Sequence, residues 1–226
     1  MDDLGYDDLN NLMTLMTGDE KHSASATSTL DVIWTLYDRV LQVSSDDPAD
    51  PTRDRFLLSK GHGPMALYAV LAAKGFISVE SLADWGTHNS SLGYHPDSNL
   101  IPGVEIASGS LGHGLPIAVG MALALRLRDN TSSRTVCLLG DAELEEGSNH
   151  EAIALAGRLG LEQLTAIVID NRSSSHGWPG GIGKRFEVEG WSSATVNGRS
   201  RSDIEGGLEA ALPGRPHVLV ATVEGK

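Results

Sequence analysis

The sequence predicts an α/β fold in which a parallel sheet is flanked by helices on both faces, contained in one domain over 1–226. Residues 135–139 and 164–169 are continuous apolar runs of strand length, and residues 148–159 between them have a helical pattern. A further apolar run at 217–223 follows a second helical stretch at 203–212. Strands that are apolar throughout are typical of a parallel sheet that is buried on both faces.

The N-terminal half is expected to consist mainly of helices around one short strand. Apolar residues recur at helical spacing in 25–43, and others fit one face of a short helix within 1–21, which we interpret as an N-terminal extension. Residues 56–58 are expected to form a strand that leads into a helix beginning at Pro64, a position that suits proline. Residues 79–85 are expected to form another helix.

Two central segments are unusual in composition. Residues 115–127 are almost wholly Ala, Val, Leu, Met and Gly, which indicates a helix that is buried on every side. Residues 86–114 form a long predicted loop that is rich in Gly, Ser, Asn and Pro. Compact domains seldom contain loops of that length unless they are functional or disordered, so this loop is a candidate part of a site.

Composition argues against several classes of function. The 226 residues contain 17 Lys plus Arg and 30 Asp plus Glu, and this net charge of −13 argues against binding of nucleic acid or an anionic membrane. The single cysteine, Cys137, cannot form an internal disulfide or a cysteine-based zinc site. No apolar run reaches the roughly 20 residues that cross a bilayer, and the N-terminus does not resemble a signal peptide. We therefore expect a soluble cytoplasmic protein.

Polar side chains follow two of the predicted strands. Asp141 comes just after the run 135–139, and Asn171 just after the run 164–169. Because a β–helix–β connection returns the chain alongside its start, both side chains should face one crevice at the carboxyl edge of the sheet. With the backbone carbonyl of Ser173, they offer oxygen ligands of the kind that Mg²⁺ or Ca²⁺ prefers. Taken alone, Asp141 and Asn171 are better explained as turn residues at the strand ends.

The same residues belong to a set of motifs that resembles the transketolase family of thiamine-diphosphate enzymes. The run Gly140-Asp141-Ala142-Glu143-Leu144-Glu145-Glu146-Gly147-Ser148, followed by Asn171, is similar to the family's diphosphate-binding signature. Further motifs follow in the family's order and span nearly the whole chain: Leu58-Ser59-Lys60-Gly61-His62-Gly63, Tyr94-His95-Pro96, Pro102-Gly103-Val104-Glu105 and Gly109-Ser110-Leu111-Gly112-His113-Gly114. The best match is the N-terminal, diphosphate-binding subunit of a split, two-component transketolase.

The resemblance implies which residues bind the diphosphate end of the cofactor. Asp141, Asn171 and the Ser173 carbonyl would hold a Mg²⁺ (or Ca²⁺) ion that bridges the two phosphates of thiamine diphosphate. Gly140 opens the signature, and the backbone N–H of Ala142 would donate a hydrogen bond to a phosphate oxygen.

It also implies roles for three histidines and for the ring-binding loop. His62 would approach the diphosphate, and the backbone at Gly109 and Leu111 would contact the aminopyrimidine ring. His22 and His95 would line the substrate channel and act in catalysis, by stabilising the donor oxygens and passing protons.

Several positions depart from the family pattern or allow a second interpretation. Ala142 replaces the second Gly of the signature, and its methyl group disfavours a positive φ. Glu146 matches an acid at the contact between subunits. Glu151 matches a family acid near the cofactor, but Ser148 and Glu151 also have the spacing of a capping box, so Glu151 is assigned no catalytic role.

The implied activity is transfer of a two-carbon ketol unit from a ketose (phosphate) donor to an aldehyde acceptor, in one half of an active site. The family's pyrimidine-binding domain does not fit in 226 residues, so a second subunit is expected to supply it, in an α₂β₂ assembly. Two alternatives remain open: delivery of the two-carbon unit to a lipoyl or acyl-carrier protein, as in 2-oxo-acid-dehydrogenase-like systems, and a non-catalytic interaction subunit. The sequence lacks the motifs that a dinucleotide-binding site or a zinc hydrolase would require.

Overall fold

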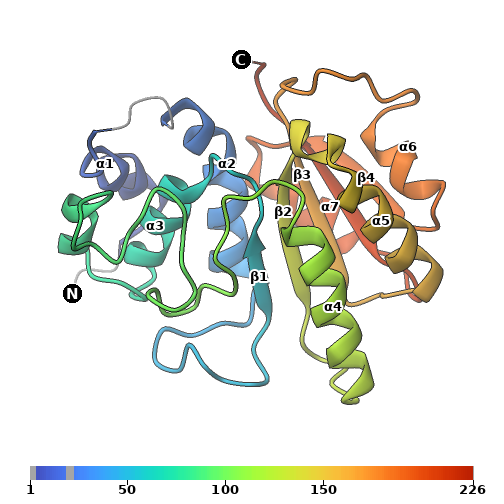
Figure 1. The fold of residues 1–226 in the computed structure, drawn as a ribbon, viewed down its shortest axis with the longest axis horizontal. Coiled ribbons are helices and arrows are strands. Elements are labelled where there is room, and N and C mark those ends of the chain that lie inside the picture. The colour runs from blue at the N-terminus through green and yellow to red at the C-terminus, as the bar shows by residue number, and fades with distance from the viewer. Residues whose placement is uncertain (1–3, 19–22, 226) are drawn as a thin grey trace.

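The fold is taken from a computed structural model, which describes residues 4–18 and 23–225. A five-stranded sheet runs through the middle of the molecule in the order β1-β2-β3-β5-β4, and every neighbouring pair of strands is parallel (Figure 1). The strands are β1 (Arg55–Leu58), β2 (Thr135–Gly140), β3 (Leu164–Asp170), β4 (Ser192–Asn197) and β5 (His217–Thr222). This confirms the predicted parallel sheet.

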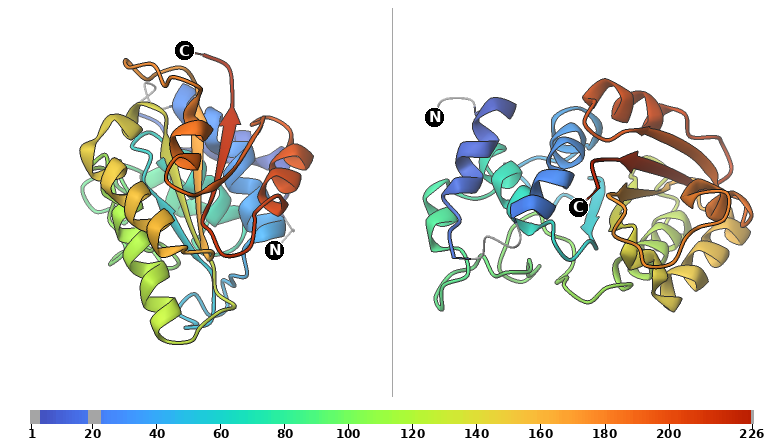
Figure 2. Two further views of the ribbon diagram at one scale, coloured as in Figure 1. Left: turned by 90° about the vertical axis from the view of Figure 1, so that its right-hand side faces the viewer. Right: turned by 90° about the horizontal axis from the view of Figure 1, so that it is seen from above.

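Helices cover both faces of the sheet, as predicted (Figure 2). They are α1 (Leu9–Thr14), α2 (Ser23–Thr35), α3 (Pro64–Ala73), α4 (Gly114–Leu127), α5 (Gly147–Leu159), α6 (Ile182–Glu187) and α7 (Arg201–Glu209). Alternate residues of β2 point to opposite faces, because Val136 and Leu138 pack with α1, α2, α3 and α7, whereas Cys137 and Leu139 pack with α4, α5 and α6. Two hydrophobic clusters therefore lie on opposite sides of one sheet.

Two elements were not predicted, and both differ from the continuous apolar pattern. β4 pairs only with β5, and four of its six residues, Ser192–Asn197, are polar, as suits an edge strand that is partly exposed. α6 is a single short helix of six residues that begins just after Gly180 and Gly181. The predicted helix at 79–85 is a 3₁₀ helix at Glu80–Asp84.

Helix α4 is not buried on every side, so that prediction is wrong for the chain on its own. Leu115, Ala118, Val119 and Ala122 pack against the sheet. The opposite face is open to solvent, where Leu127 is 75% exposed. The predicted N-terminal helix is present as α1, and Leu9 and Leu12 bury it in the core shared with α2 and α3.

The predicted capping box at the start of α5 is also wrong. The helix begins at Gly147, so Ser148 lies inside its first turn, and the N-cap residue is Glu146. The Ser148 hydroxyl instead donates a hydrogen bond of 2.7 Å to the carbonyl of Gly112, in the loop before α4. A tertiary contact has replaced the local one.

Over residues 4–18 and 23–225, no helix combines the length and apolar character that crossing a bilayer requires.

Candidate functional site

A cavity of about 390 Å³ lies beyond the carboxyl ends of β1, β2 and β3, where a parallel sheet places its ligands. Its lining joins residues from five separate stretches of the chain: Lys60, Gly61, His62, His95, Gly109, Leu111, Gly140, Ala142, Glu143, Asn171 and Ser173. Most of the predicted site residues are thus brought together. Asp141 is buried beside the cavity, and His22 lies outside the described residues.

Asp141 is held by the loop that follows β3. Its carboxylate accepts hydrogen bonds from the backbone N–H of Ser173 at 2.7 Å, the Ser173 hydroxyl at 2.5 Å and the N–H of Ser174 at 3.2 Å. The N–H of Ala142 donates to the same carboxylate at 2.9 Å. Asp141 therefore fixes the loop after β3 against the end of β2.

Asn171 offers an oxygen that has no protein partner. The residue is 2% exposed, and its side-chain Oδ1 is buried without a hydrogen bond. Such an acceptor costs free energy unless something else satisfies it. A bound cation would do so, and the carboxylate and carboxamide oxygens present fit a hard ion such as Mg²⁺.

The donor set does not suit a transition-metal cage. Within the part of the chain that the structure describes, no three His, Cys, Asp or Glu side chains are grouped so that they could hold a metal ion by themselves. An ion here would rely on the Asp141 and Asn171 oxygens together with water and ligand phosphates, which is the usual arrangement for Mg²⁺. The residues present therefore fit the predicted magnesium site.

Two backbone conformations shape this edge of the cavity. Arg172, between Asn171 and Ser173, has a φ of +57°, which is left-handed and costly for a residue with a side chain. Ala142 does not need such a conformation, because it continues from Asp141 into a 3₁₀ helix, Ala142–Glu145. The replacement of glycine by Ala142 is thus accommodated without a positive φ.

The opposite edge is formed by the long loop before α4. Gly109 has a φ of +117°, and a Cβ atom built on it would lie only 2.7 Å from Cγ of His95. A Cβ atom on Gly61 would lie 3.2 Å from Cδ2 of Leu111. Close packing of glycines against His95 and Leu111 therefore brings the loop before α4 next to the segment that carries His62.

Glu143 and Lys60 line the cavity, although the sequence predicted a role for neither. Glu143 is 2% exposed, and burial raises the pKa of its carboxyl above the ordinary value, although hydrogen bonds from Ser59, Gly112 and Gly140 act in the opposite direction. Lys60 is 7% exposed, and its charge also lowers that pKa. Glu143 is one of three acids in the run 143–146, and no local signal separates it from the other two.

A second acid, Glu145, fastens the loop after β3 from the outside. Its carboxylate accepts hydrogen bonds from the backbone N–H of His176 and from both the N–H and hydroxyl of Ser175, as well as from the Ser174 hydroxyl. These donors lower the pKa of Glu145 to about 2. Asp141 and Glu145 together hold the segment 173–176 at two points.

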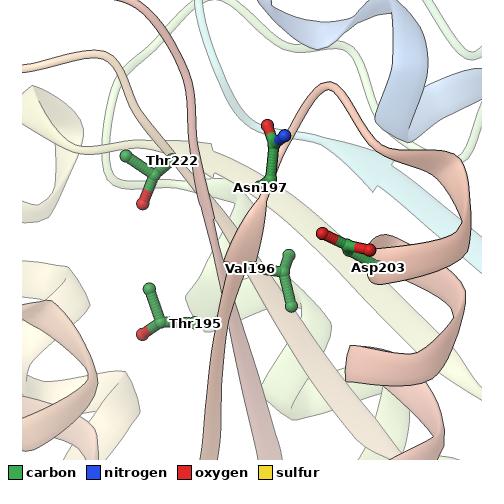
Figure 3. Close-up of a pocket in the computed structure, with 5 residues that line it drawn as sticks. All are labelled: Thr195, Val196, Asn197, Asp203 and Thr222. Carbon is green, nitrogen blue, oxygen red and sulfur yellow. The ribbon is translucent and has the colours of Figure 1, made fainter.

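A larger hollow of about 600 Å³ lies elsewhere, along the edge strand β4 (Figure 3). Thr195 and Thr222 lie on one side of the β4–β5 pair, and Val196 and Asp203 on the other. No predicted site residue borders this hollow, and its lining contains neither a histidine nor a lysine or arginine. Its chemistry gives no reason to prefer it over the cavity at the carboxyl edge.

Comparison with known proteins now identifies the family. Residues 13–225 match the family model described as "Transketolase, thiamine diphosphate binding domain". The chain belongs to this transketolase family. The fold agrees, because transketolase from Campylobacter jejuni superposes on 97% of the chain with a TM-score of 0.80 and 26% identity. The chain spans only 38% of that transketolase.

Two curated relatives from bacteria are similar over most of the chain. "Ferredoxin fas2" of Rhodococcoides fascians is 55% identical over 98% of this chain and 73% of its own length. A protein of Phocaeicola vulgatus that is named as one subunit of an apulose-4-phosphate transketolase is 36% identical over 91% of this chain and 75% of its own length. This chain therefore contains the family's thiamine-diphosphate-binding domain. In the Phocaeicola relative, a similar sequence belongs to a protein named as one subunit of a transketolase.

Proposed function

We propose that this chain is the diphosphate-binding subunit of a two-component transketolase that transfers a two-carbon ketol unit from a ketose (phosphate) donor to an aldehyde acceptor. The observation that carries the proposal is the position of Asn171, whose unpartnered oxygen borders the same cavity as His62 and His95. The Phocaeicola relative is named as one subunit of a transketolase, which supports a protein that works with a partner.

When bound, thiamine diphosphate supplies an electron sink at its thiazolium ring, and the protein supplies position, charge and proton transfer. On this chain, Asp141, Asn171 and the carbonyl of Ser173 would hold the Mg²⁺ ion at the diphosphate end. Gly140, Ala142 and His62 would contact the phosphates there, and the N–H of Ala142 would exchange its hydrogen bond to Asp141 for one to a phosphate oxygen.

The other end of the cavity would bind the rings and the substrate. The backbone at Gly109 and Leu111 would orient the aminopyrimidine ring. His95 lies against Gly109, where it would hold the donor oxygens and pass protons. His22, placed by sequence alone, would do the same from the N-terminal side.

We further propose that the partner subunit completes the site with a carboxylate at the pyrimidine ring, in an α₂β₂ assembly. The exposed apolar face of α4, with Ile117 and Leu127, is compatible with burial by such a partner. Glu146 is exposed at the start of α5, where it could lie at a contact between subunits.

The ferredoxin in the name of the Rhodococcoides relative does not transfer to this chain. An iron–sulfur cluster of the ferredoxin type is bound by four cysteine thiolates. Residues 1–226 contain one cysteine, Cys137, which is buried in β2, and burial raises the pKa of its thiol.

The test is reconstitution of the chain with the subunit that co-purifies with it. With thiamine diphosphate and Mg²⁺, the complex should transfer a ketol unit from a ketose phosphate to an aldehyde, while the chain alone should not. Asp141→Ala should abolish turnover, and Glu209→Ala, an exposed acid at the end of α7, should leave it unchanged.

Three results would contradict the proposal. Turnover by the isolated chain would remove the need for a partner. Transfer only to a lipoyl or acyl-carrier protein would replace the acceptor. No calorimetric binding of thiamine diphosphate, with or without the partner, would indicate a non-catalytic interaction subunit.

A further inference from the structure

The buried carboxylate of Glu143 connects three segments that are far apart in the sequence. Its Oε1 accepts hydrogen bonds from the Ser59 hydroxyl and from the N–H of Gly112, the latter at 3.0 Å. Its Oε2 accepts from the N–H of Gly140 at 3.2 Å. Ser59 follows β1, Gly112 lies in the loop before α4, and Gly140 ends β2.

Each of these segments carries predicted cofactor residues next to the atom that Glu143 binds. Ser59 precedes the run with His62, and Gly140 precedes Asp141 and Ala142. Gly112 follows directly on Leu111. One side chain therefore contacts three of the five segments that line the cavity, each at its backbone or hydroxyl.

Further hydrogen bonds hold Glu143 itself in place. Asn149 donates from Nδ2 to the backbone carbonyl of Glu143 at 2.7 Å. The Ser59 hydroxyl also accepts from the N–H of Gly114 at 3.0 Å. A buried network in which each donor meets an acceptor is rigid, and it is costly to leave partly unsatisfied.

A carboxylate is the side chain that this arrangement requires. Three donors converge on it, and an ionised carboxylate offers acceptors on both oxygens without a hydrogen of its own. Glutamine at 143 would keep one acceptor oxygen for Ser59 and Gly112. Its amide group would then direct N–H bonds at the N–H of Gly140, where an acceptor is needed.

We propose that Glu143 is a positioning residue, which sets the place of the ring-binding loop (Gly109–Gly112) relative to the diphosphate-binding end of β2. This inference rests on the proposed function for the identity of the ligand. The placement of the loop by Glu143 can be measured without any ligand.

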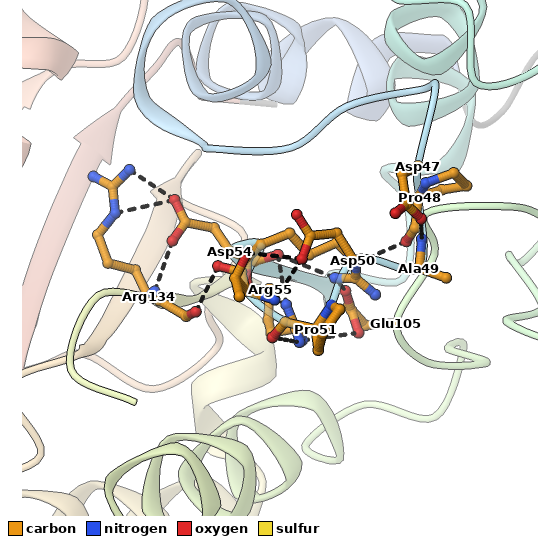
Figure 4. Close-up of polar contacts among 12 residues, drawn as sticks. Asp47, Pro48, Ala49, Asp50, Pro51, Asp54, Arg55, Glu105 and Arg134 are labelled. Carbon is orange, nitrogen blue, oxygen red and sulfur yellow. Dashed lines mark hydrogen bonds and ion pairs between the residues drawn. The ribbon is translucent and has the colours of Figure 1, made fainter. Parts of the chain in front are cut away.

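The chain offers a matched control at the opposite ends of the same strands (Figure 4). Asp54 is 1% exposed and precedes β1, and its carboxylate accepts from the N–H of Gln42 and from the backbone and side chain of Arg134, which precedes β2. Like Glu143, it is a buried acid that joins the β1 and β2 segments through several donors. Unlike Glu143, it is remote from the cavity lining.

The experiment compares Glu143→Gln with Asp54→Asn, which are the same chemical change at the two ends of the strands. Amide hydrogen exchange of the ligand-free chain is followed at 109–112. In addition, thiamine diphosphate is titrated calorimetrically, with Mg²⁺, into the complex with the partner subunit. Ser59→Ala, which removes one of the three bonds, replaces Glu143→Gln if that variant does not fold.

The mismatch between the glutamine amide and the N–H of Gly140 should displace the side chain, so that Gly112 loses its acceptor as well. We therefore expect Glu143→Gln to accelerate exchange at Gly112 about 10-fold and to weaken thiamine diphosphate binding about 10-fold, as the loss of one buried hydrogen bond predicts. Asp54→Asn should lower the melting temperature, but it should neither accelerate exchange at 109–112 nor weaken thiamine diphosphate binding. Unchanged exchange at 109–112 in Glu143→Gln, or the same acceleration in Asp54→Asn, would overturn the positioning role. An unchanged dissociation constant would also overturn it.

Failure of the proposed function looks different in the same experiment. If the wild-type complex binds no thiamine diphosphate, the proposed function is wrong. The exchange measurement then still decides whether Glu143 places the loop.

Discussion

Ser173 touches Asp141 twice, through its backbone N–H at 2.7 Å and its hydroxyl at 2.5 Å. The two residues are 32 positions apart in the sequence, and both were predicted as cation ligands. The contact explains how a loop without regular structure can be part of a defined site. Its conformation is fixed by the end of the neighbouring strand.

Removing the Asp141 carboxylate should therefore loosen the loop after β3 and also remove a cation ligand. In EDTA, we expect Asp141→Ala to lower the free energy of unfolding by about 1–3 kcal/mol, because three backbone N–H groups lose their acceptor. That corresponds to a melting temperature lower by roughly 2–12 °C for a chain of this size. Mg²⁺ with thiamine diphosphate should raise the melting temperature of the wild type but not of the variant. An equal ligand-induced rise in both proteins would show that Asp141 does not bind the ion.

The left-handed conformation of Arg172 predicts that a glycine variant is more stable than a valine variant there, which is the reverse of the order within a helix. At this position, with a φ of +57°, Arg172→Gly should be close to neutral and Arg172→Val should be destabilised by about 1–2 kcal/mol relative to it. At the exposed Arg158 in α5, valine should be better than glycine by about 0.5 kcal/mol. Urea unfolding of the four variants measures both differences. The same order at both positions would contradict the conformation described for Arg172.

Gly109 has no room for a side chain, since a Cβ atom would meet the His95 ring at 2.7 Å and φ is +117°. Gly109→Ala should displace His95 and weaken thiamine diphosphate binding to the complete complex by about 10-fold or more. Gly206→Ala is the control, because Gly206 lies in α7 with open space around it. That change should stabilise the chain by about 0.5–1 kcal/mol and leave cofactor affinity unaltered. Wild-type affinity in Gly109→Ala would refute the predicted role of this loop.

The buried histidine of β5 gives the protein a predictable dependence on pH. His217 is 1% exposed, its Nε2 lies 3.0 Å from the carbonyl of Gly207, and its Nδ1 lies 2.9 Å from the Ser192 hydroxyl. Burial lowers the pKa of His217 below the ordinary 6.5, although the hydrogen bond to Gly207 acts in the opposite direction. The folded protein thus binds this proton more weakly than the unfolded chain does. The contribution of His217 to stability is full above pH 6.5 and is lost as the pH falls from there through the folded-state pKa.

Urea midpoints measured between pH 8 and pH 5 test this prediction. The wild type should lose more stability than His217→Gln over the acidic part of that range, by no more than about 1.4 kcal/mol per pH unit. His88→Gln is the control, because His88 is exposed in the loop after the 3₁₀ helix at Glu80–Asp84. Parallel curves for the wild type and His217→Gln would contradict the prediction.

The central strands could be predicted because their residues are buried along most of their length. Every residue of β2 is buried, so the segment is apolar from Val136 to Leu139 and stands out from its surroundings. The edge strand β4 differs from β2 in this respect. One of its edges is unpaired and its burial is mixed, so the segment 192–197 has no pattern that separates it from a loop.

The end of the site that contains Asp141 and Asn171 was predictable for a related reason. Parallel strands end at the same edge, so Asp141 and Asn171 had to lie near one another once both strands were recognised. The histidines were a different matter. Only the family motifs, and no local pattern, pointed to His62 and His95 as site residues.

Glu143 and Ser148 show what local patterns leave out. Ser148 has the spacing of a helix cap but hydrogen-bonds to Gly112 instead. Glu143 is one of several adjacent acids, and only its burial among Ser59, Gly112 and Gly140 makes it different. In both cases the deciding partner is more than 30 positions away, in a segment whose location depends on the complete fold.

The place of β1 at the end of the sheet also determines the order in which the molecule can be assembled during synthesis. β1 pairs only with β2, and Arg55 lies opposite Thr135, which is translated 80 residues later. Until that point has left the ribosome, β1 has no strand to pair with. Closing so long a segment makes folding slow, because its entropy must be lost before the strand pair forms. The segments that carry His62 and His95 are thus translated early but can take up their final places only late.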